Sequence, residues 1–232
     1  MQKVLNKFVK KIKKQDYELD KEIKLKDIFI LSINKTILLI RGTIRKQGFK
    51  IRGKNTFIGK KVKLKYKHYI STGNAVTIED YVELNALSKN GIKLGDNVKI
   101  GSHTIISCTG SLENIGVGVD IGANSGVGDY CFFGAAGGIK IGNHVIMGQN
   151  VRFHSENHKF DRIDIPIKQQ GVTNKGIKID NDCWIGSGVV FLDGVTIGRG
   201  CVIGANTLVN KNIPPYSVAV GNPVKIVKDR RI

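Results

Sequence analysis

Proline, cysteine and acidic residues are scarce in this chain of 232 residues. With 4 Pro against 28 Gly and 41% hydrophobic residues, it is neither collagen-like nor a disordered Pro/Gly-rich chain. Its 4 Cys, at positions 108, 131, 183 and 201, form no CxxC pair and no zinc-ligand spacing. These features argue against a disulfide or zinc framework, and we expect reduced thiols in a cytoplasmic protein.

Long apolar runs are also missing. The most apolar stretch, residues 28–40, contains Asn34 and Lys35. It is shorter than the roughly 20 apolar residues that span a bilayer. The first 14 residues are charged and lack the apolar core and cleavage site of a signal peptide. We therefore expect a location in the cytoplasm or at the inner face of the membrane.

Negative charge is rare at the beginning of the chain. Residues 1–68 hold 21 Lys and Arg against 5 Asp and Glu, a net charge of +16 out of +18. Lys and Arg among Ile and Leu can form an amphipathic segment that binds an anionic membrane or an acidic polysaccharide. The alternative is a solvated helix whose apolar face caps the rest of the protein. Nucleic-acid binding is not expected, because aromatic residues are not interleaved with the basic ones.

The dominant feature is a repeat of six residues, as in "IGRGCVIGAN" at 197–206. An apolar residue followed by Gly starts ten such hexads, and the fifth position is usually small or β-branched. Because the period is neither helical nor that of an ordinary strand, it predicts a solenoid. The hexads start at Leu94, Ile100, Ile121, Val127, Phe133, Ile141, Met147, Ile185, Ile197 and Ile203.

Each hexad can form one short strand and one corner. Three hexads then close a triangular coil of 18 residues, and stacked coils share parallel-sheet hydrogen bonds about 4.8 Å apart. The first and fifth positions point into the core. Cys183 and Cys201 are one coil apart at fifth positions, so we predict a packing role for both.

Breaks in the repeat suggest the domain organisation. We expect a basic helical or irregular N-terminal arm at 1–57, a β-helix at 58–213 and a turn with a short tail or helix at 214–232. The repeat slips by three residues between Ile106 and Ile121, slips by two at 137–142, and is lost between Phe153 and Ile179. We interpret residues 154–176 as a functional loop that projects from one corner of the prism.

Residues 90–228 resemble the hexapeptide-repeat acyltransferases with a left-handed parallel β-helix. The blocks "WIG", "GVTIG", "VIGA", "IPPYS" and "GNP" within 177–227 are similar to the galactoside, maltose and polysaccharide O-acetyltransferases. The upstream "NHKFD", followed by "PI" and "QQG", is most similar to capsule and O-antigen sugar acetyltransferases. The resemblance implies a homotrimer with acetyl-CoA bound in clefts between neighbouring prisms, and a His that acts as general base.

The resemblance places that base at His158, eight residues after Asn150. A neutral imidazole can take a hydroxyl proton as the hydroxyl attacks the thioester. His154 is a weaker candidate for substrate contact, and so is Asp129, which could bind a sugar hydroxyl or orient the base. His103 and His144 occupy outward-facing positions of their hexads. No third His accompanies His154 and His158, so no metal site is expected.

Block by block, the same resemblance implies an acetyl-CoA groove. Ser187 and Ala205 would flank the pantetheine arm, and Trp184 would wall the cleft. Lys211 and Lys225 would meet phosphates, although the family often has Arg where Lys225 stands. The alternative for all five residues is ordinary prism surface or an interface.

The sequence thus predicts an acetyl-CoA-dependent O-acetyltransferase. Its acceptor is expected to be a sugar hydroxyl in the synthesis of capsule, O-antigen or another surface polysaccharide, and lipid-linked sugars are among the candidate acceptors. An amino-sugar nitrogen or an antibiotic hydroxyl is the nearest alternative acceptor. A non-catalytic β-helix scaffold or binding protein is the alternative from another class.

Overall fold

The computed structural model describes residues 20, 22–109 and 111–232. The chain divides into two compact units, Met1–Ile37 and Leu38–Ile232. Part of the predicted basic arm, residues 1–19 and 21, lies outside the described residues. Helix α2 runs from Leu25 to Arg45 and crosses from the first unit into the second.

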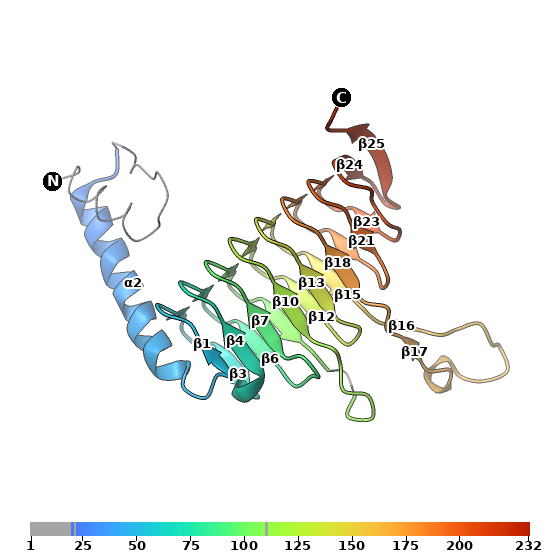
Figure 1. Ribbon diagram of the computed structural model, residues 1–232, viewed down its shortest axis with the longest axis horizontal. Helices are drawn as coiled ribbons and strands as arrows, with labels where there is room; N and C mark the ends of the chain where they lie inside the picture. Colours follow the sequence, from blue (N-terminus) through green and yellow to red (C-terminus); the bar gives the residue numbers. More distant parts are fainter. Residues whose placement is uncertain (1–19, 21, 110) are drawn as a thin grey trace. The chain divides into compact units, whose positions relative to one another are not determined.

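The second unit is a parallel β-helix whose strands stack coil upon coil, as Figure 1 shows. Every complete coil contributes one strand to each of three sheets, which we call A, B and C in the order in which the chain visits them. Sheet A consists of β1 (Ile51–Arg52), β4 (Ile70–Thr72), β7 (Ile92–Leu94), β10 (Val119–Ile121), β13 (Ile139–Ile141), β18 (Ile177–Ile179) and β21 (Thr196–Ile197).

The other two sheets repeat the same order along the prism. Sheet B consists of β2 (Phe57–Ile58), β5 (Thr77–Ile78), β8 (Lys99–Ile100), β11 (Gly126–Val127), β14 (Ile146–Met147), β19 (Trp184–Ile185), β22 (Val202–Ile203), β24 (Ser217–Val220) and β25 (Lys225–Asp229). Sheet C consists of β3 (Lys63–Lys65), β6 (Glu83–Asn85), β9 (Ile105–Ser107), β12 (Phe132–Gly134), β15 (Arg152–His154), β20 (Val190–Phe191) and β23 (Leu208–Val209).

The core is a column of aliphatic and aromatic side chains from the first position of each hexad. The rings of Phe133, Phe153 and Phe191 are fully buried and stack in successive coils, with centroids 4.5 and 4.9 Å apart. The fifth positions also point inward, and both Cys183 and Cys201 are buried. The predicted arrangement of inward positions is therefore confirmed.

The coil length departs from the predicted 18 residues. Lys178 pairs with Thr196 at that spacing, whereas Ile121 pairs with Ile141, which is 20 residues later. The extra residues lie at the corner between sheets C and A, so the A–B and B–C corners keep their hexads. This corner explains the slips in the sequence pattern.

The two ends of the prism are closed differently. Gly42 of α2 is buried, and a Cβ there would lie 1.8 Å from the carbonyl oxygen of Thr56. Arg41 and Arg45 donate to the carbonyls of Ile58 and Val62 at 3.2 and 2.6 Å, so the end of α2 caps the first coil.

At the other end, the predicted tail or short helix is instead a β-hairpin. β24 continues sheet B in parallel with β22, and β25 returns antiparallel to β24. The helix alternative was wrong because the alternating residues of "SVAV" supply an inward face that continues the core, with Ser217 and Ala219 buried. The first strand, at Ile51, likewise lies before residue 58.

Candidate functional site

The segment without hexads forms a loop at the C–A corner. It leaves the prism after β15 and re-enters at β18, and it carries β16 (Asn157–His158), the 3-10 helix η2 (Ile167–Gln169) and β17 (Val172–Thr173). β16 and β17 pair antiparallel, with His158 opposite Val172. The loop extends beyond the stacked coils as a hairpin, as Figure 1 shows.

Asp193 holds the foot of this loop. One carboxylate oxygen accepts the backbone N–H groups of Lys175 and Gly176 at 3.0 and 2.8 Å. The other accepts the hydroxyl of Thr173 at 3.2 Å. Because Asp193 lies one coil further on, these bonds fix the returning strand of the hairpin to the body of the prism. The sequence interpretation missed this residue, and its only local signal is the Asp-Gly turn in "LDGV".

The two candidate histidines have different surroundings. His158 is exposed on the hairpin. His154 is half-buried on the outer face of sheet C, with its ring 5.8 Å from that of Phe132. It lines a cavity of about 200 Å³ together with Ser107, Thr109 and Glu156.

Burial, and then the charge of Arg152, lower the pKa of His154 below the ordinary 6.5. Both effects disfavour the charged imidazolium. His154 is therefore held neutral on a rigid strand, whereas His158 stands in solvent on a projecting hairpin. A neutral imidazole at either position could accept a proton.

Four of the predicted cofactor residues follow one corner of the prism, between sheets B and C. Ser187 and Ala205 occupy equivalent corner positions of successive coils, and Asn206 donates its backbone N–H to the carbonyl of Ser187 at 2.9 Å. Trp184 lies just before this corner on the outer face of sheet B and is 58% exposed. Lys225 begins β25 opposite Val220, at the same corner beyond Ala205.

Lys211 is placed elsewhere. It follows β23 and lies between sheets C and A, so the width of sheet C separates it from Ser187 and Ala205. His158 also projects from the C–A side. One chain therefore brings together Trp184, Ser187, Ala205 and Lys225, and it does not bring His158 or Lys211 to them.

Asp129 has a structural partner at the same B–C corner. Its carboxylate accepts the backbone N–H of Ser102 in the preceding coil at 2.8 Å. Asp80 does the same for Lys60 at 2.7 Å, and the hydroxyl of Ser187 does so for Gln149 at 3.3 Å. Side chains at this corner position thus form a ladder of caps, in which both Asp129 and Ser187 take part.

His103 and His144 lie at corners and are exposed, as expected. The ring of His103 stacks between those of Tyr81 and Tyr130, with centroids 4.7 and 4.8 Å away. The sequence interpretation missed this exposed stack, whose members are separated by whole coils in the sequence. Among residues 20, 22–109 and 111–232, no group of three or more His, Cys, Asp or Glu side chains could hold a metal ion.

The four thiols are all buried. Burial raises the pKa of Cys108 to about 12 and that of Cys131 to about 11. The Sγ atom of Cys183 lies 3.2 Å from the carbonyl oxygen of Gly198 and that of Cys201 lies 3.0 Å from the carbonyl oxygen of Pro214, both inside the coil. These positions agree with packing, and the raised pKa values of Cys108 and Cys131 disfavour the reactive thiolate form of those two side chains.

Comparison with known proteins identifies the repeat. The model of the family described as "Bacterial transferase hexapeptide (six repeats)" matches residues 176–211. "Probable acetyltransferase Rv3034c" of Mycobacterium tuberculosis is 37% identical over 172 residues, which cover 73% of this chain and 55% of that protein. The chain spans about half the length of the curated relatives it matches, at 55%, 42% and 56% for the first three.

Solved structures show the same architecture. A mutant of AntD, an N-acyltransferase from Bacillus cereus in complex with dTDP-4-amino-4,6-dideoxyglucose and coenzyme A, superposes with a TM-score of 0.56 at 22% identity, covering 82% of this chain and 89% of that one. AntD with dTDP and 3-hydroxybutyryl-CoA gives 0.55 at 21% identity, covering 82% and 88%. With the three stacked sheets, these matches confirm the predicted fold, a left-handed parallel β-helix built from hexapeptide repeats.

Proposed function

We propose that this protein transfers an acetyl group from acetyl-CoA to a sugar hydroxyl in the synthesis of capsule, O-antigen or another surface polysaccharide. The observation that carries the proposal is the alignment of Trp184, Ser187, Ala205 and Lys225 along one corner of the prism, combined with an exposed histidine on a projecting hairpin. The relative named as an acetyltransferase supports the reaction class.

The B–C corner has the features that a pantetheine arm requires. Ser187 and Ala205 are small, and in this proposal the exposed ring of Trp184, just before the same corner, would form an apolar wall. Lys225 supplies a point charge at the end of this row, where phosphates would lie. In this proposal, the hydroxyl of Ser187 still accepts the backbone N–H of Gln149. Ser187 would therefore contact the pantetheine arm without taking part in the reaction.

His158 would act as the general base. Its imidazole would accept the acceptor hydroxyl proton as the hydroxyl oxygen attacks the thioester carbonyl carbon. A carbon–oxygen bond forms, the carbon–sulfur bond breaks, and CoA leaves as the thiol after protonation. In this proposal His154 would line the acceptor side of the site, and its position in the cavity beside Ser107 and Glu156 supports that role.

The arrangement of a single chain supports a homotrimer. His158 projects from the C–A corner, whereas the proposed CoA groove follows the B–C corner, so the two lie on opposite edges of sheet C. We propose that the hairpin of one subunit reaches the groove of its neighbour, which completes the site. Cross-linking with mass measurement and sedimentation would test this assembly, and a monomer that transfers acetyl groups would contradict it.

One observation favours a second acceptor class. AntD acts as an N-acyltransferase and is bound to an amino sugar nucleotide. An amino group attacks a thioester through the same geometry, and the base then removes a proton from nitrogen instead of oxygen. Amino-sugar acetylation is therefore the second candidate, and matched hydroxyl and amino forms of one sugar nucleotide distinguish it from the first.

The first experiment is acetyl transfer detected by mass spectrometry. The panel would contain sugars, nucleotide sugars and lipid-linked glycans, with His158→Ala beside the native chain. We expect the substitution to lower the rate by about 10²–10⁴-fold, the usual contribution of a general base. His144→Asn is the matched control, because His144 is an exposed corner residue in another part of the prism.

Each result assigns a role. A native rate in His158→Ala would exclude His158 as the base and favour His154. A chain that neither binds acetyl-CoA nor transfers an acetyl group would leave the scaffold alternative. Transfer to the amino sugar alone would replace the O-acetyltransferase proposal with the second candidate.

Membrane association is a separate part of the proposal. No helix within residues 20, 22–109 and 111–232 is long and apolar enough to cross a membrane. Helix α2 nevertheless exposes large apolar side chains, including Phe29 at 67% and Leu31 at 58%, among basic residues. Such a surface can lie on anionic lipid. Co-sedimentation with anionic vesicles, lost at high salt or after Phe29→Ser with Leu31→Ser, would support peripheral binding.

A further inference from the structure

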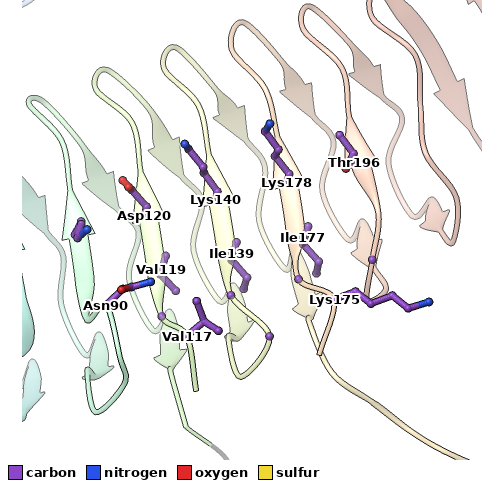
Figure 2. A pocket seen from close by; sticks show the side chains of 16 residues that line it. Asn90, Val117, Val119, Asp120, Ile139, Lys140, Lys175, Ile177, Lys178 and Thr196 are labelled. Atoms are coloured by element: carbon purple, nitrogen blue, oxygen red, sulfur yellow. The ribbon is translucent and has the colours of Figure 1, made fainter. Parts of the chain in front are cut away.

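A groove on the outer face of sheet A lies apart from the proposed CoA corner. It has a volume of about 430 Å³ and follows successive coils along the prism. Backbone at the C–A corner, with Gly118, Gly138, Gly176 and Gly194, forms part of its lining. Figure 2 shows the side chains that line this groove, and three of the labelled ones are lysines.

The central side chains of the sheet A strands form a row of cations. Lys93, Lys140 and Lys178 occupy equivalent positions in β7, β13 and β18, with Asp120 of β10 between the first two. At the usual spacing of neighbouring strands, the row from Lys93 to Lys178 extends about 14 Å. The side chains of Lys140 and Lys178 project in the same direction, as Figure 2 shows.

These cations are unpaired. All three lysines are exposed, and none has an ion pair or a side-chain hydrogen bond with residues 20, 22–109 or 111–232. Asp120 lies opposite Lys93 and Lys140, whereas Lys140 lies directly opposite Lys178, and like charges in this register destabilise a sheet.

On each of the other two faces, one lysine forms an ion pair with an acidic side chain. On sheet C, Lys63 lies opposite Glu83 and the two side chains form an ion pair at 2.5 Å. On sheet B, the ammonium group of Lys99 lies 3.4 Å from the carboxylate of Glu79. Lys65 on sheet C is also exposed and lies opposite Asn85, so what distinguishes the sheet A groove is that its lysines form a row across successive coils.

We infer that this groove binds a segment of an acidic glycan, a chain that carries carboxylate groups and lies along the prism axis. A row of positive charges across several coils suits an extended ligand with repeated negative charges. Asn90 and Thr196, at the two ends of the lining, can hydrogen-bond sugar hydroxyl groups. Among the described residues (20, 22–109 and 111–232), the lining of the groove includes no aromatic or arginine side chain on which nucleobases could stack.

The groove also leads to the proposed catalytic hairpin. Lys175 and Gly176 line it, and the same two residues form the returning foot of the loop that carries His158. A glycan in the groove would therefore extend toward that loop. This inference rests on the proposed function for its purpose, since the bound glycan would be the acceptor, but binding itself requires no acetyl transfer.

The test is lysine footprinting, because the basic N-terminal arm would also attract a polyanion and obscure a simple affinity measurement. The full-length chain would be acetylated with an amine-reactive ester, with and without an alginate oligosaccharide, and each lysine quantified by mass spectrometry. We expect labelling of Lys93, Lys140 and Lys178 to slow by about tenfold, as a bound anionic chain shields them. Lys65 and Lys99, on strands of the other two sheets, are internal controls.

Variants test the same site independently. Lys140→Ser with Lys178→Ser should abolish the protection of Lys93, whereas Lys65→Ser with Lys99→Ser, which removes the same charge, should leave it unchanged. Neutral dextran oligosaccharides should protect none of these lysines. Protection confined to residues 1–68, equal protection by single-stranded DNA or anionic vesicles, or equal effects of the two double variants would overturn the inference.

Failure of the groove and failure of the proposed function give different results. Protection of the row in a chain that transfers no acetyl group would keep the binding site and reject the enzyme. Acetyl transfer to a small sugar without protection by alginate would keep the enzyme and reject the groove.

Discussion

The three corners of the prism follow two different rules. At the A–B and B–C corners, the hexad length is kept and backbone atoms of neighbouring coils approach closely. At the C–A corner, the length changes from coil to coil, and the loop between β15 and β18 is inserted there. The changes in coil length and the inserted loop therefore lie at the C–A corner.

The difference shows which positions the stacking constrains. A residue at the B–C corner lies against the same position one coil above and below, so its size affects both neighbours. The C–A corner can project away from the stack, because a projecting segment leaves the three sheets in register. Insertion there places the hairpin of His158 and borders the sheet A groove without interrupting the core.

Removing one aromatic ring from the core and one from the loop tests this difference most directly. Phe153 stacks between Phe133 and Phe191 in the core, whereas Phe160 on the loop is 71% exposed. Phe153→Ala should lower the free energy of unfolding by about 3–5 kcal/mol. Phe160→Ala should change it by less than about 0.5 kcal/mol. Urea unfolding followed by circular dichroism would measure both, and similar losses would contradict the assignment of the loop to a region outside the core.

Two glycines, one at the B–C corner and one on an outer face, test how strongly stacking restricts the corner. A Cβ at Gly148, on the B–C corner, would lie 2.4 Å from the Ser187 hydroxyl oxygen and 2.7 Å from its backbone nitrogen. A Cβ at Gly126, on the outer face of β11, would meet no atom of the described residues within 4 Å. Gly148→Ala should cost about 1–3 kcal/mol through overpacking. Gly126→Ala should be neutral or slightly stabilising, and thermal unfolding of both variants would show whether close stacking restricts the corner.

The hexad pattern was sufficient to predict the prism, its inward positions and the place of the loop. A residue such as Ile141 must be apolar because it stacks on Ile121 and Ile179, and that constraint is visible in the sequence. The sheet A strands also repeat a local pattern, "GIKLG", "GVDIG", "GIKIG" and "GIKID". Its lysines were visible, but their grouping on one face required the register of coils of unequal length.

Other features depend on contacts that the hexads do not specify. Asp193 became a candidate only when its carboxylate was found at the foot of a loop that leaves the prism one coil earlier. The role of Asp129 as a cap for Ser102 likewise depends on which coil lies beside it. The cofactor and catalytic roles of Ser187, Lys211 and His158 remain predictions, because in the proposed trimer each site would be formed by two chains.

Asp193 allows the hairpin to be loosened without touching its histidine. Asp193→Ala removes the acceptor shared by Thr173, Lys175 and Gly176, which should cost about 1 kcal/mol of stability. Hydrogen exchange should accelerate across residues 157–176 and remain slow in the sheets. In the acetyl-transfer assay, the rate should fall more than the apparent affinity for acetyl-CoA changes. Asp193→Asn, which keeps one acceptor oxygen, should restore part of the loss, and unchanged exchange in the alanine variant would argue against a positioning role.

The smallest expected effect is the titration of His154, which separates the strand histidine from the hairpin histidine. Burial and Arg152 lower its pKa below 6.5, so its NMR titration midpoint should lie on the acid side of that value. Arg152→Gln should raise the midpoint only partly, because burial is the larger cause.

The neutral ring of His154 contributes fully to stability above about pH 6.5, where this side chain is also neutral in the unfolded chain. That contribution is lost as the pH falls through the lower folded value, since the unfolded state binds the proton first. The pH dependence of unfolding should therefore become shallower over this acid range in His154→Gln, and an unaltered slope would show that the ring is not held neutral by its position on the prism.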